Sequence, residues 1–299
     1  MPTLIMISGP TASGKSALAV DVAEHLGTEI ISADSRQIYK GIPIATAVPT
    51  PEELARVRHH LVETLPLDAY YSASEFETEA LRIIRGLLAE RGVAVACGGS
   101  MMYVDALCHG IDELPTVPDE VRLGLMAQHS ANGDEWLLSE LEQLDPEYYR
   151  QVDRKNIKRV FHAVEIIRTA GQTFTSLRTG IRRERDFRIV KVLLEAERSL
   201  LFDRINRRVD NMVEAGLEHE AEKVWPLRHL NSLNTVGLKE MFAMSEGKMT
   251  RTEAIERIKK NTRVYAKKQM TWRKNDRSWH RIDISDRDIL SKTIGFYSS

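Results

Sequence analysis

The sequence predicts an α/β fold in which a doubly wound parallel sheet is interrupted by an inserted all-helical subdomain. Apolar strand patterns alternate with helical patterns over the first third of the chain, and this alternation is typical of parallel sheets. The middle of the chain then shows helical patterns alone, and the strand signal returns at residues 188–196, "RIVKVLLEA". We therefore expect a discontinuous core, residues 1–111 and 186–299, around a helical insertion at 112–185.

Short apolar runs and a glycine stop define the first elements. Leu4–Ser8 is expected to form a buried strand, and residues 16–26 a helix that ends at Gly27. "EIIS", residues 29–32, predicts the second strand. A glycine-rich loop therefore joins the first strand to the first helix.

The next helix is expected from about Glu75 to Arg91. Ser74 would be its N-cap, with Glu77 three residues later in a capping box, and Gly92 would end it. "VAVAC", residues 93–97, has no polar alternation, as is typical of a strand that is covered on both faces.

Helical patterns fill the insertion at residues 120–129, 134–144 and 156–171. After the returning strand, helices are expected to about Asn275, and "WHRIDI", residues 279–284, is expected to close the sheet. The insertion would thus be helical and both flanking parts would contribute strands.

The composition excludes binding of polyanions through overall charge. The chain has 42 Lys and Arg residues against 43 Asp and Glu residues, so nucleic acid would have to meet a local basic patch. The two cysteines, Cys97 and Cys108, are too few for a disulfide framework and lack the spacing of a zinc site. No apolar run suits a membrane span or a signal peptide. We expect a cytoplasmic monomer with no membrane partner.

Residues 9–16, "GPTASGKS", match the phosphate-binding pattern G-x-x-x-x-G-K-[ST] between a predicted strand and a predicted helix. In this P-loop NTPase-like arrangement, backbone N–H groups and the helix N-terminus meet phosphate oxygens. Lys15 would neutralise charge, and the Ser16 hydroxyl would bind Mg²⁺. The predicted phosphate-binding residues are Gly9, Pro10, Thr11, Ala12, Ser13, Gly14, Lys15 and Ser16.

Asp34, in "IISADSRQIY", is the one acidic residue at the end of a predicted strand. The strand "VAVAC" ends in Cys97, where an ATPase or GTPase usually carries an acid. Asp34 and the phosphate loop are expected at the same sheet edge, where α/β proteins bind ligands. Asp34 can assist Mg²⁺ binding, act as a general base or cap the turn after its strand. The residues alone leave these roles open.

Several segments occur in one order along the chain: "GPTASGKS", "SADSRQIYKG", "HHLVE", "YSASEF", "GGSMMYVDAL", "RVFHAVEI", "VGLKEM" and "KKQMTWRK". Together they resemble the bacterial tRNA dimethylallyltransferase (tRNA isopentenyltransferase) family over roughly residues 3–275. The phosphate loop alone is generic, whereas its combination with "DSRQIY" and "KKQMTW" is specific. The resemblance implies transfer of a dimethylallyl group from dimethylallyl diphosphate to N6 of the adenine just 3′ of the anticodon in tRNA, with release of diphosphate.

The resemblance also implies roles for individual residues. Lys15, the loop and Mg²⁺ at Ser16 would neutralise charge on the leaving diphosphate. Asp34 would accept the proton that the adenine amine loses. Arg208 would be a second clamp on the diphosphate, with a solvated helix arginine as the alternative. Because the target adenine must leave its stack, a tunnel is expected.

The implied partner is the tRNA anticodon stem-loop. The Gln37 amide would pair with the adenine edge or brace its own turn, and Ser100 would contact RNA or cap a helix. The predicted tRNA-binding residues are Asp34, Ser35, Arg36, Gln37, Ser100, Arg122, Lys158, Arg159, Val160, Phe161 and His162. The last six would give the insertion its contact with tRNA.

Residues 251–274 show an independent RNA-binding pattern. If this stretch is helical, one face carries the basic residues Lys259, Arg263 and Lys267. Another face carries Ile258, Thr262, Tyr265 and Trp272. We expect the basic face to meet phosphate and the other face to pack.

Four residues depart from the family pattern: Ala45, Val48, His162 and Leu238 stand where Gly, Lys, Arg and Tyr are usual. Ser100 replaces the usual Thr and keeps the hydroxyl. The departures bear on tRNA contact and motivate the hypothesis of a divergent copy with an altered choice of tRNA.

Two other functions share parts of this sequence pattern. A small-molecule or nucleotide kinase would use the same loop, an early Asp and a helical lid with arginines from 178 to 188. A binding module would hold nucleotide and RNA without catalysis. The adjacent His59 and His60 lack a third ligand, so no metal is expected there.

Overall fold

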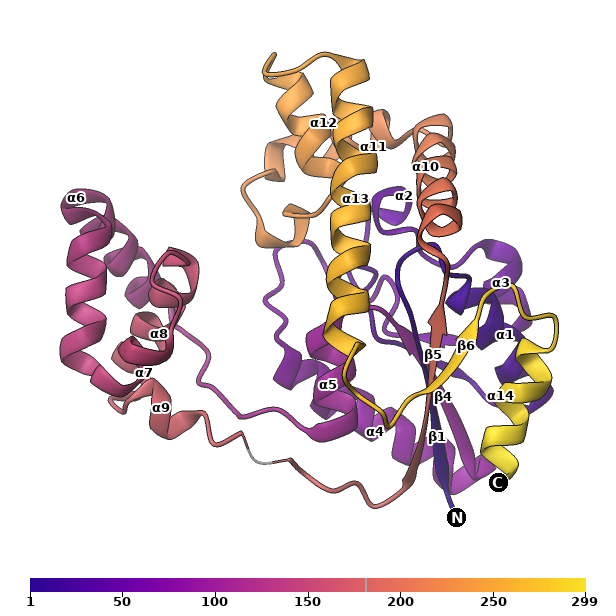
Figure 1. Ribbon diagram of the computed structural model, residues 1–299. Helices are drawn as coiled ribbons and strands as arrows, with labels where there is room; N and C mark the ends of the chain where they lie inside the picture. Colours follow the sequence, from indigo (N-terminus) through magenta and orange to yellow (C-terminus); the bar gives the residue numbers. More distant parts are fainter. Residues whose placement is uncertain (181) are drawn as a thin grey trace. The chain divides into compact units, whose positions relative to one another are not determined.

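The computed structural model describes residues 1–180 and 182–299, which divide into two units (Figure 1). The core unit comprises Met1–Cys108 and Arg185–Ser299, and the insertion unit comprises His109–Glu184. The expected insertion began at 112 and ended at 185.

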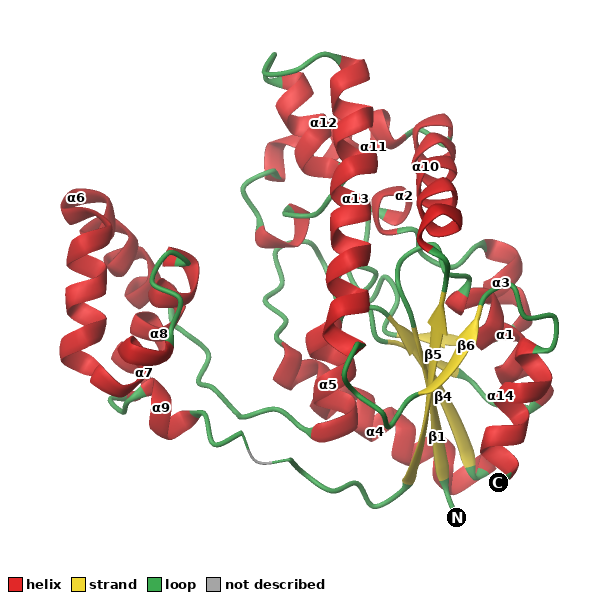
Figure 2. Ribbon diagram, viewed as in Figure 1, coloured by secondary structure: helices red, strands yellow, loops and turns green. Residues whose placement is uncertain are grey.

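The core unit is built on a six-stranded sheet in which every pair is parallel, in the order β3-β2-β4-β1-β5-β6 (Figure 2). The strands are β1 (Thr3–Ser8), β2 (Ile30–Ser32), β3 (His59–His60), β4 (Val93–Gly98), β5 (Arg188–Glu195) and β6 (His280–Asp283). The short edge strand β3 was not predicted, because two histidines carry no strand signal. The other five strands were.

The helices of the core unit cover both faces of the sheet. Leu4 and Met6 of β1 belong to the core that includes α4, and Ile5 and Ile7 belong to the opposite core with α1. The predicted doubly wound α/β fold is therefore confirmed. The helices are α1 (Lys15–His25), α2 (Pro43–Thr46), α3 (Pro51–Arg56), α4 (Ala73–Arg91), α5 (Met101–His109), α10 (Arg198–Glu214), α11 (Leu217–Val224), α12 (Leu238–Ser245), α13 (Arg251–Arg273) and α14 (Ile289–Ser298).

The start of α4 corrects one prediction. Ser72, not Ser74, is the N-cap, and it forms a capping box with Glu75. Both serines are followed by Glu three residues later, so the pattern fits either position. Glu77 instead lies inside the core unit, where its carboxylate pairs with Arg185 at 2.6 Å.

Arg185, the first residue of the second core segment, makes several contacts with the first core segment. Its guanidinium donates to the backbone carbonyls of Ala106 and Leu107, near the end of α5, at 2.6 and 3.0 Å. The ion pair with Glu77 is buried, with side chains only 7% and 5% exposed. Arg185 therefore holds the end of α5 close to the first residues of the segment that returns to the core unit.

The insertion unit has its own apolar core and, in its described residues, only helices. They are α6 (Asp119–Leu144), α7 (Pro146–Gln151), α8 (Ile157–Ala170) and α9 (Phe174–Leu177). Two predicted helices form α6, which bends at Gly133, where φ is 80°. Leu125, Leu141 and Val164 lie in the core of this unit.

No helix within residues 1–180 and 182–299 combines the length and the apolar character that crossing a bilayer requires.

Candidate active site

The phosphate loop, residues 9–16, leaves β1 and enters α1 in a conformation suited to an anion. Ala12 and Gly14 have positive φ values of 64° and 88°, a backbone region that glycine adopts readily. Gly14 precedes α1 without a side-chain hydrogen bond to the helix start, so backbone N–H groups remain for a ligand. A Cβ on Gly9 would lie 2.8 Å from the Ser13 Oγ and 3.0 Å from the Leu194 carbonyl oxygen. The close approach therefore requires glycine there.

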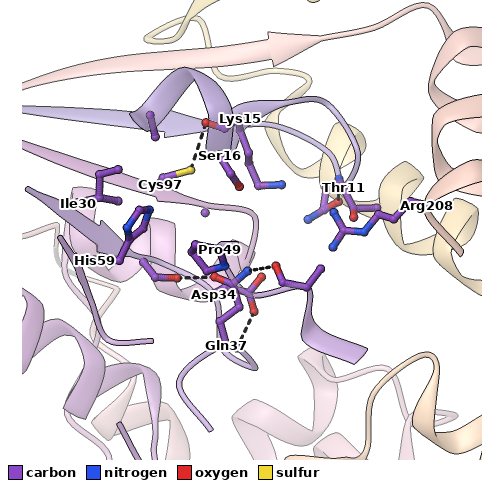
Figure 3. Close-up of a pocket in the computed structure, with 15 residues that line it drawn as sticks. Thr11, Lys15, Ser16, Ile30, Asp34, Gln37, Pro49, His59, Cys97 and Arg208 are labelled. Carbon is purple, nitrogen blue, oxygen red and sulfur yellow. Dashed lines mark hydrogen bonds between the residues drawn. The ribbon is translucent and has the colours of Figure 1, made fainter. Parts of the chain in front are cut away.

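The loop opens into a cavity that we call the loop cavity, lined among others by Thr11, Lys15, Ser16, Asp34, Arg208 and Gln269. Figure 3 shows Lys15 and Arg208 extending toward each other, with Asp34 across from them. Burial lowers the pKa of both cations, and the charge of Asp34 opposes the shift. Asp34 is the only carboxylate among the described residues of the lining. Two desolvated cations facing one carboxylate favour an anionic ligand.

Asp34 follows β2 and has one carboxylate oxygen committed to its own turn. Its Oδ1 accepts hydrogen bonds from the backbone N–H groups of Arg36 and Gln37, at 2.9 and 3.4 Å. The other oxygen has no hydrogen-bond partner among the described residues. Asp34 thus caps its turn and still offers a carboxylate oxygen to a ligand, so the predicted structural role and a chemical role are compatible.

Two further cavities adjoin the loop cavity. The middle cavity shares Thr11, Asp34 and Arg208 with it and adds Tyr265. The outer cavity shares Asp34 and Tyr265 with the middle cavity and is also lined by Ser100, Lys239 and Lys268. Among the described lining residues, Asp34 is the one common to all three cavities. The series is arranged like the expected tunnel, with the carboxylate where the cavities meet.

Gln269 of α13 is a site residue that the sequence reasoning missed. Its Oε1 accepts from the Thr11 backbone N–H at 2.8 Å, and its Nε2 donates to the Gly99 carbonyl at 2.9 Å. The side chain is only 6% exposed. A Cβ on Gly99 would lie 2.3 Å from this Nε2. Gln269 lies in the segment "KKQMTW", which belongs to the family resemblance but by itself indicates no role for the glutamine.

Ser35 and Ser100, two predicted tRNA-binding residues, are held to each other. The Ser100 Oγ accepts from the Ser35 backbone N–H at 2.8 Å and donates to the Ser35 Oγ at 3.2 Å. Ser100 directly precedes α5, but its hydroxyl joins two loops. Both residues line the outer cavity.

Arg36 and Gln37 also form contacts within the core unit. The Arg36 guanidinium donates to the Asn231 carbonyl at 2.8 Å. The Gln37 amide donates to the Ala47 carbonyl at 2.8 Å and accepts from the Ser32 hydroxyl at 2.9 Å. Gln37 therefore braces its turn, which is the alternative to base pairing. Contact of either residue with tRNA stays a prediction.

In the insertion unit, Arg122 and His162 share the carboxylate of Glu165. The distances are 3.0 Å from Arg122 Nε and 2.8 Å from His162 Nδ1. Burial raises the pKa of Glu165, but hydrogen bonds from His162 and Arg122 hold it below its ordinary value. The two predicted tRNA-binding residues thus belong to one charged cluster.

The remaining predicted residues of this unit differ in exposure. Lys158 and Arg159 are exposed, Phe161 is half-buried, and Val160 is fully buried in the core of the unit. Val160 therefore packs and presents no side-chain surface to a ligand in this structure. Contact of the others with tRNA stays a prediction.

The predicted basic residues of α13 differ in their contacts. The Lys259 ammonium pairs with Asp210 of α10 at 2.8 Å, and the Arg263 guanidinium donates to Asn206 Oδ1 at 2.6 Å. Lys259 and Arg263 thus help to hold α10 and α13 together, whereas Lys267 is exposed. Contact of this face with phosphate stays a prediction. Tyr265, expected to pack, lines the middle and outer cavities instead.

The four residues that depart from the family pattern differ in burial. Ala45 is buried, and its backbone N–H donates to Glu220 Oε1 at 2.7 Å. Leu238 is fully buried at the start of α12, whereas Val48 is half-buried and His162 is exposed. Their effect on the choice of tRNA stays a prediction.

No cluster of three potential metal ligands occurs among the described residues, and His60 pairs with Glu29 at 2.6 Å.

The fold and the site define a P-loop protein, a class whose loop commonly binds di- or triphosphates. A phosphate loop follows the first strand of a parallel sheet, and two cations lie in the cavity beside it. Many enzyme classes share this arrangement, so similarity to known proteins must distinguish among them.

The family model described as IPP transferase matches residues 37–276. A tRNA dimethylallyltransferase from Parabacteroides distasonis is 52% identical over 276 residues, which cover 92% of this chain and 92% of that protein. One from Bacteroides thetaiotaomicron is 53% identical over 276 residues, covering 92% of this chain and 90% of that protein. The chain belongs to the tRNA dimethylallyltransferase family, so the predicted family is confirmed.

Solved structures agree. The full-length tRNA isopentenylpyrophosphate transferase from Bacillus halodurans is 34% identical with a TM-score of 0.72, covering 100% of this chain and 95% of that chain. A eukaryotic dimethylallyltransferase acting on tRNA is 22% identical with a TM-score of 0.80, covering 99% and 78%, and supports the fold alone. The predicted activity, tRNA dimethylallyl transfer, is confirmed. The kinase and the binding module are not supported.

Proposed function

We propose that the three cavities form the tunnel in which a dimethylallyl group passes from dimethylallyl diphosphate to N6 of the adenine 3′ of the anticodon. The loop cavity holds the diphosphate, and the adenine enters through the outer and middle cavities. The observation that carries this assignment is the position of Asp34, which lines all three cavities. The donor and the acceptor can therefore meet beside one carboxylate.

In the proposed reaction, the lone pair of the adenine amine attacks C1 of the donor. The bond between C1 and oxygen breaks, and its electron pair leaves with the diphosphate. The unpartnered carboxylate oxygen of Asp34 accepts the proton that N6 loses. Lys15, Arg208 and the N–H groups at the start of α1 stabilise charge on the leaving group.

The residues of the loop cavity fit Mg²⁺. Mg²⁺ usually takes one or two protein oxygens together with substrate phosphates and water, and the Ser16 hydroxyl and Asp34 line the same cavity as Lys15. Ser16 would hold the ion. When bound, the ion would neutralise diphosphate charge.

The transfer itself is tested by incubating the purified protein with dimethylallyl diphosphate and an anticodon stem-loop RNA that carries adenine 3′ of the anticodon. Mass analysis of the nucleosides should show the dimethylallyl adduct at that position alone. Absence of the adduct, with a control family member active under the same conditions, would refute the proposed function.

Replacing Arg208 by Met is expected to raise the KM for dimethylallyl diphosphate roughly 10–100-fold, because a hydrogen bond to a charged group contributes about 1.5–3 kcal/mol. Steady-state kinetics with the donor varied would measure the change. Arg207→Met on the same helix is the control, since Arg207 is exposed and does not line the cavity. Equal KM values for the two variants would remove Arg208 from diphosphate binding.

Replacing Ser16 by Ala is expected to raise the Mg²⁺ concentration needed for half-maximal activity by about tenfold or more, because losing a group that holds a metal typically weakens binding to that extent. Titration with MgCl₂ after removal of metal by EDTA would measure it. Ser16→Thr keeps the hydroxyl and should behave like the unchanged protein. An unshifted Mg²⁺ titration for Ser16→Ala would contradict the assignment.

A further inference from the structure

One face of α13 runs along the cavities. Ile258, Thr262, Tyr265 and Gln269 follow one another at helical spacing. Ile258 and Thr262 line the middle cavity, Tyr265 lines the middle and outer cavities, and Gln269 lines the loop cavity. This face is thus a wall of the proposed tunnel.

Tyr265 is the aromatic residue of this wall. It supplies the only Phe, Tyr or Trp ring among the described residues that line the three cavities, and it is 36% exposed. Asp34 lines both cavities that Tyr265 lines. The hydrogen bonds of Gln269, one turn further along α13, tie the helix to the phosphate loop. The ring therefore has a defined position relative to the carboxylate.

The outer cavity around Tyr265 suits a segment of RNA. Among the described residues that line it, Arg36, Lys239 and Lys268 are the cations and Asp34 is the only acid. Lys239 and Lys268 are exposed, and neither has an ion-pair partner among the described residues. Such cations can hold the phosphates that flank an extruded base.

A base that leaves the anticodon loop loses the stacking of its neighbours. Proteins that bind unstacked bases commonly replace that stacking with an aromatic side chain. The other exposed aromatic ring of α13, Trp272, donates through its Nε1 to Asp105 at 2.5 Å and lines none of the three cavities. Tyr265 is therefore the ring on α13 that an extruded base can reach beside Asp34.

We propose that Tyr265 is the stacking residue for the target adenine, holding the extruded purine in the middle cavity with its N6 toward Asp34. The inference rests on the proposed function and adds the residue that binds the base. Burial raises the pKa of the Tyr265 phenol to about 12, so the hydroxyl keeps its proton near neutral pH. Tyr265 thus binds the base and leaves proton acceptance to Asp34.

The test compares Tyr265→Leu, which removes the aromatic ring, with Tyr265→Phe, which keeps it. With an anticodon stem-loop RNA as the varied substrate, Leu should lower kcat/KM by about tenfold or more, and Phe should stay within about twofold of the unchanged protein. The KM for dimethylallyl diphosphate should not change in either variant. Thr271→Ala is the control, because Thr271 is exposed on the same helix and lines none of the three cavities.

A second readout does not depend on transfer. A stem-loop that carries 2-aminopurine at the target position should fluoresce less when bound to the unchanged protein or Tyr265→Phe than when bound to Tyr265→Leu, because stacking on the ring quenches the base. Equal kcat/KM and equal fluorescence for Leu and the unchanged protein would overturn the inference. Equal impairment of Phe and Leu would also overturn it, because the hydroxyl rather than the ring would then matter. Failure of the unchanged protein to modify RNA would instead refute the proposed function.

Discussion

Asp34→Asn is expected to lower turnover roughly 10²–10⁴-fold, the range attributed to a positioned general base, while binding of dimethylallyl diphosphate stays near normal. An amide oxygen can still accept from the backbone N–H groups of Arg36 and Gln37, so the turn after β2 keeps its cap. The amide cannot take the proton from N6. Asn therefore separates the chemical role of Asp34 from its structural role, which Asp34→Ala would remove at the same time.

Single-turnover kinetics with saturating donor and RNA would measure the chemical step of Asp34→Asn, and equilibrium binding of a non-reactive donor analogue would measure the donor site. Asp68→Asn is a matched control, because Asp68 is exposed and lines none of the three cavities. Near-normal turnover of Asp34→Asn would remove Asp34 from the role of proton acceptor.

Gln269→Met is expected to reduce both the affinity for the donor and the stability of the fold. Methionine has a similar length but can neither accept from the Thr11 N–H nor donate to the Gly99 carbonyl. Each buried group left without a partner costs about 1–3 kcal/mol. We expect the free energy of unfolding to fall by that order and kcat/KM for the donor to fall by about tenfold or more.

Gln269→Glu separates the effect of Gln269 on donor binding by the phosphate loop from its effect on the free energy of unfolding. Its carboxylate can still accept from Thr11, but it cannot donate to Gly99 and adds a negative charge beside the diphosphate. We expect this variant to lose donor affinity even where urea unfolding shows partial recovery of stability relative to Gln269→Met. Thr271→Ala, an exposed position on the same helix, is the control. If both Gln269 variants bound the donor normally, the tie between α13 and the phosphate loop would have no role in catalysis.

Local motifs made much of the site predictable. The phosphate loop lies between a strand and a helix that are adjacent in sequence, so its conformation follows from eight consecutive residues. Asp34 was identifiable because it lies two residues after the short apolar strand β2. Both features depend on nearby residues and on the general rule that ligands bind at the C-terminal edge of parallel strands.

Contacts between distant segments were not predictable. Gln269 and Thr11 are 258 positions apart, and nothing local to the glutamine indicates that it faces the phosphate loop. The contacts of Lys259 and Arg263 with α10 were not predictable for the same reason, since basic residues on a helix fit either RNA phosphate or a neighbouring helix. Lys259 contacts α10 because Asp210 on that helix offers it a carboxylate. The strand β3 was missed because its hydrogen bonds with β2, not its residue types, define it.

The anchor at Arg185 has an evolutionary consequence. One side chain joins the end of α5, the buried Glu77 and the first residue of the returning core segment, so the chain departs from the sheet and comes back to it at a single fastened point. Lengthening or trimming the helices between His109 and Glu184 would leave the register of β1, β4 and β5 untouched. Descendants of this enzyme could thus acquire new appendages there while inheriting an unaltered catalytic scaffold.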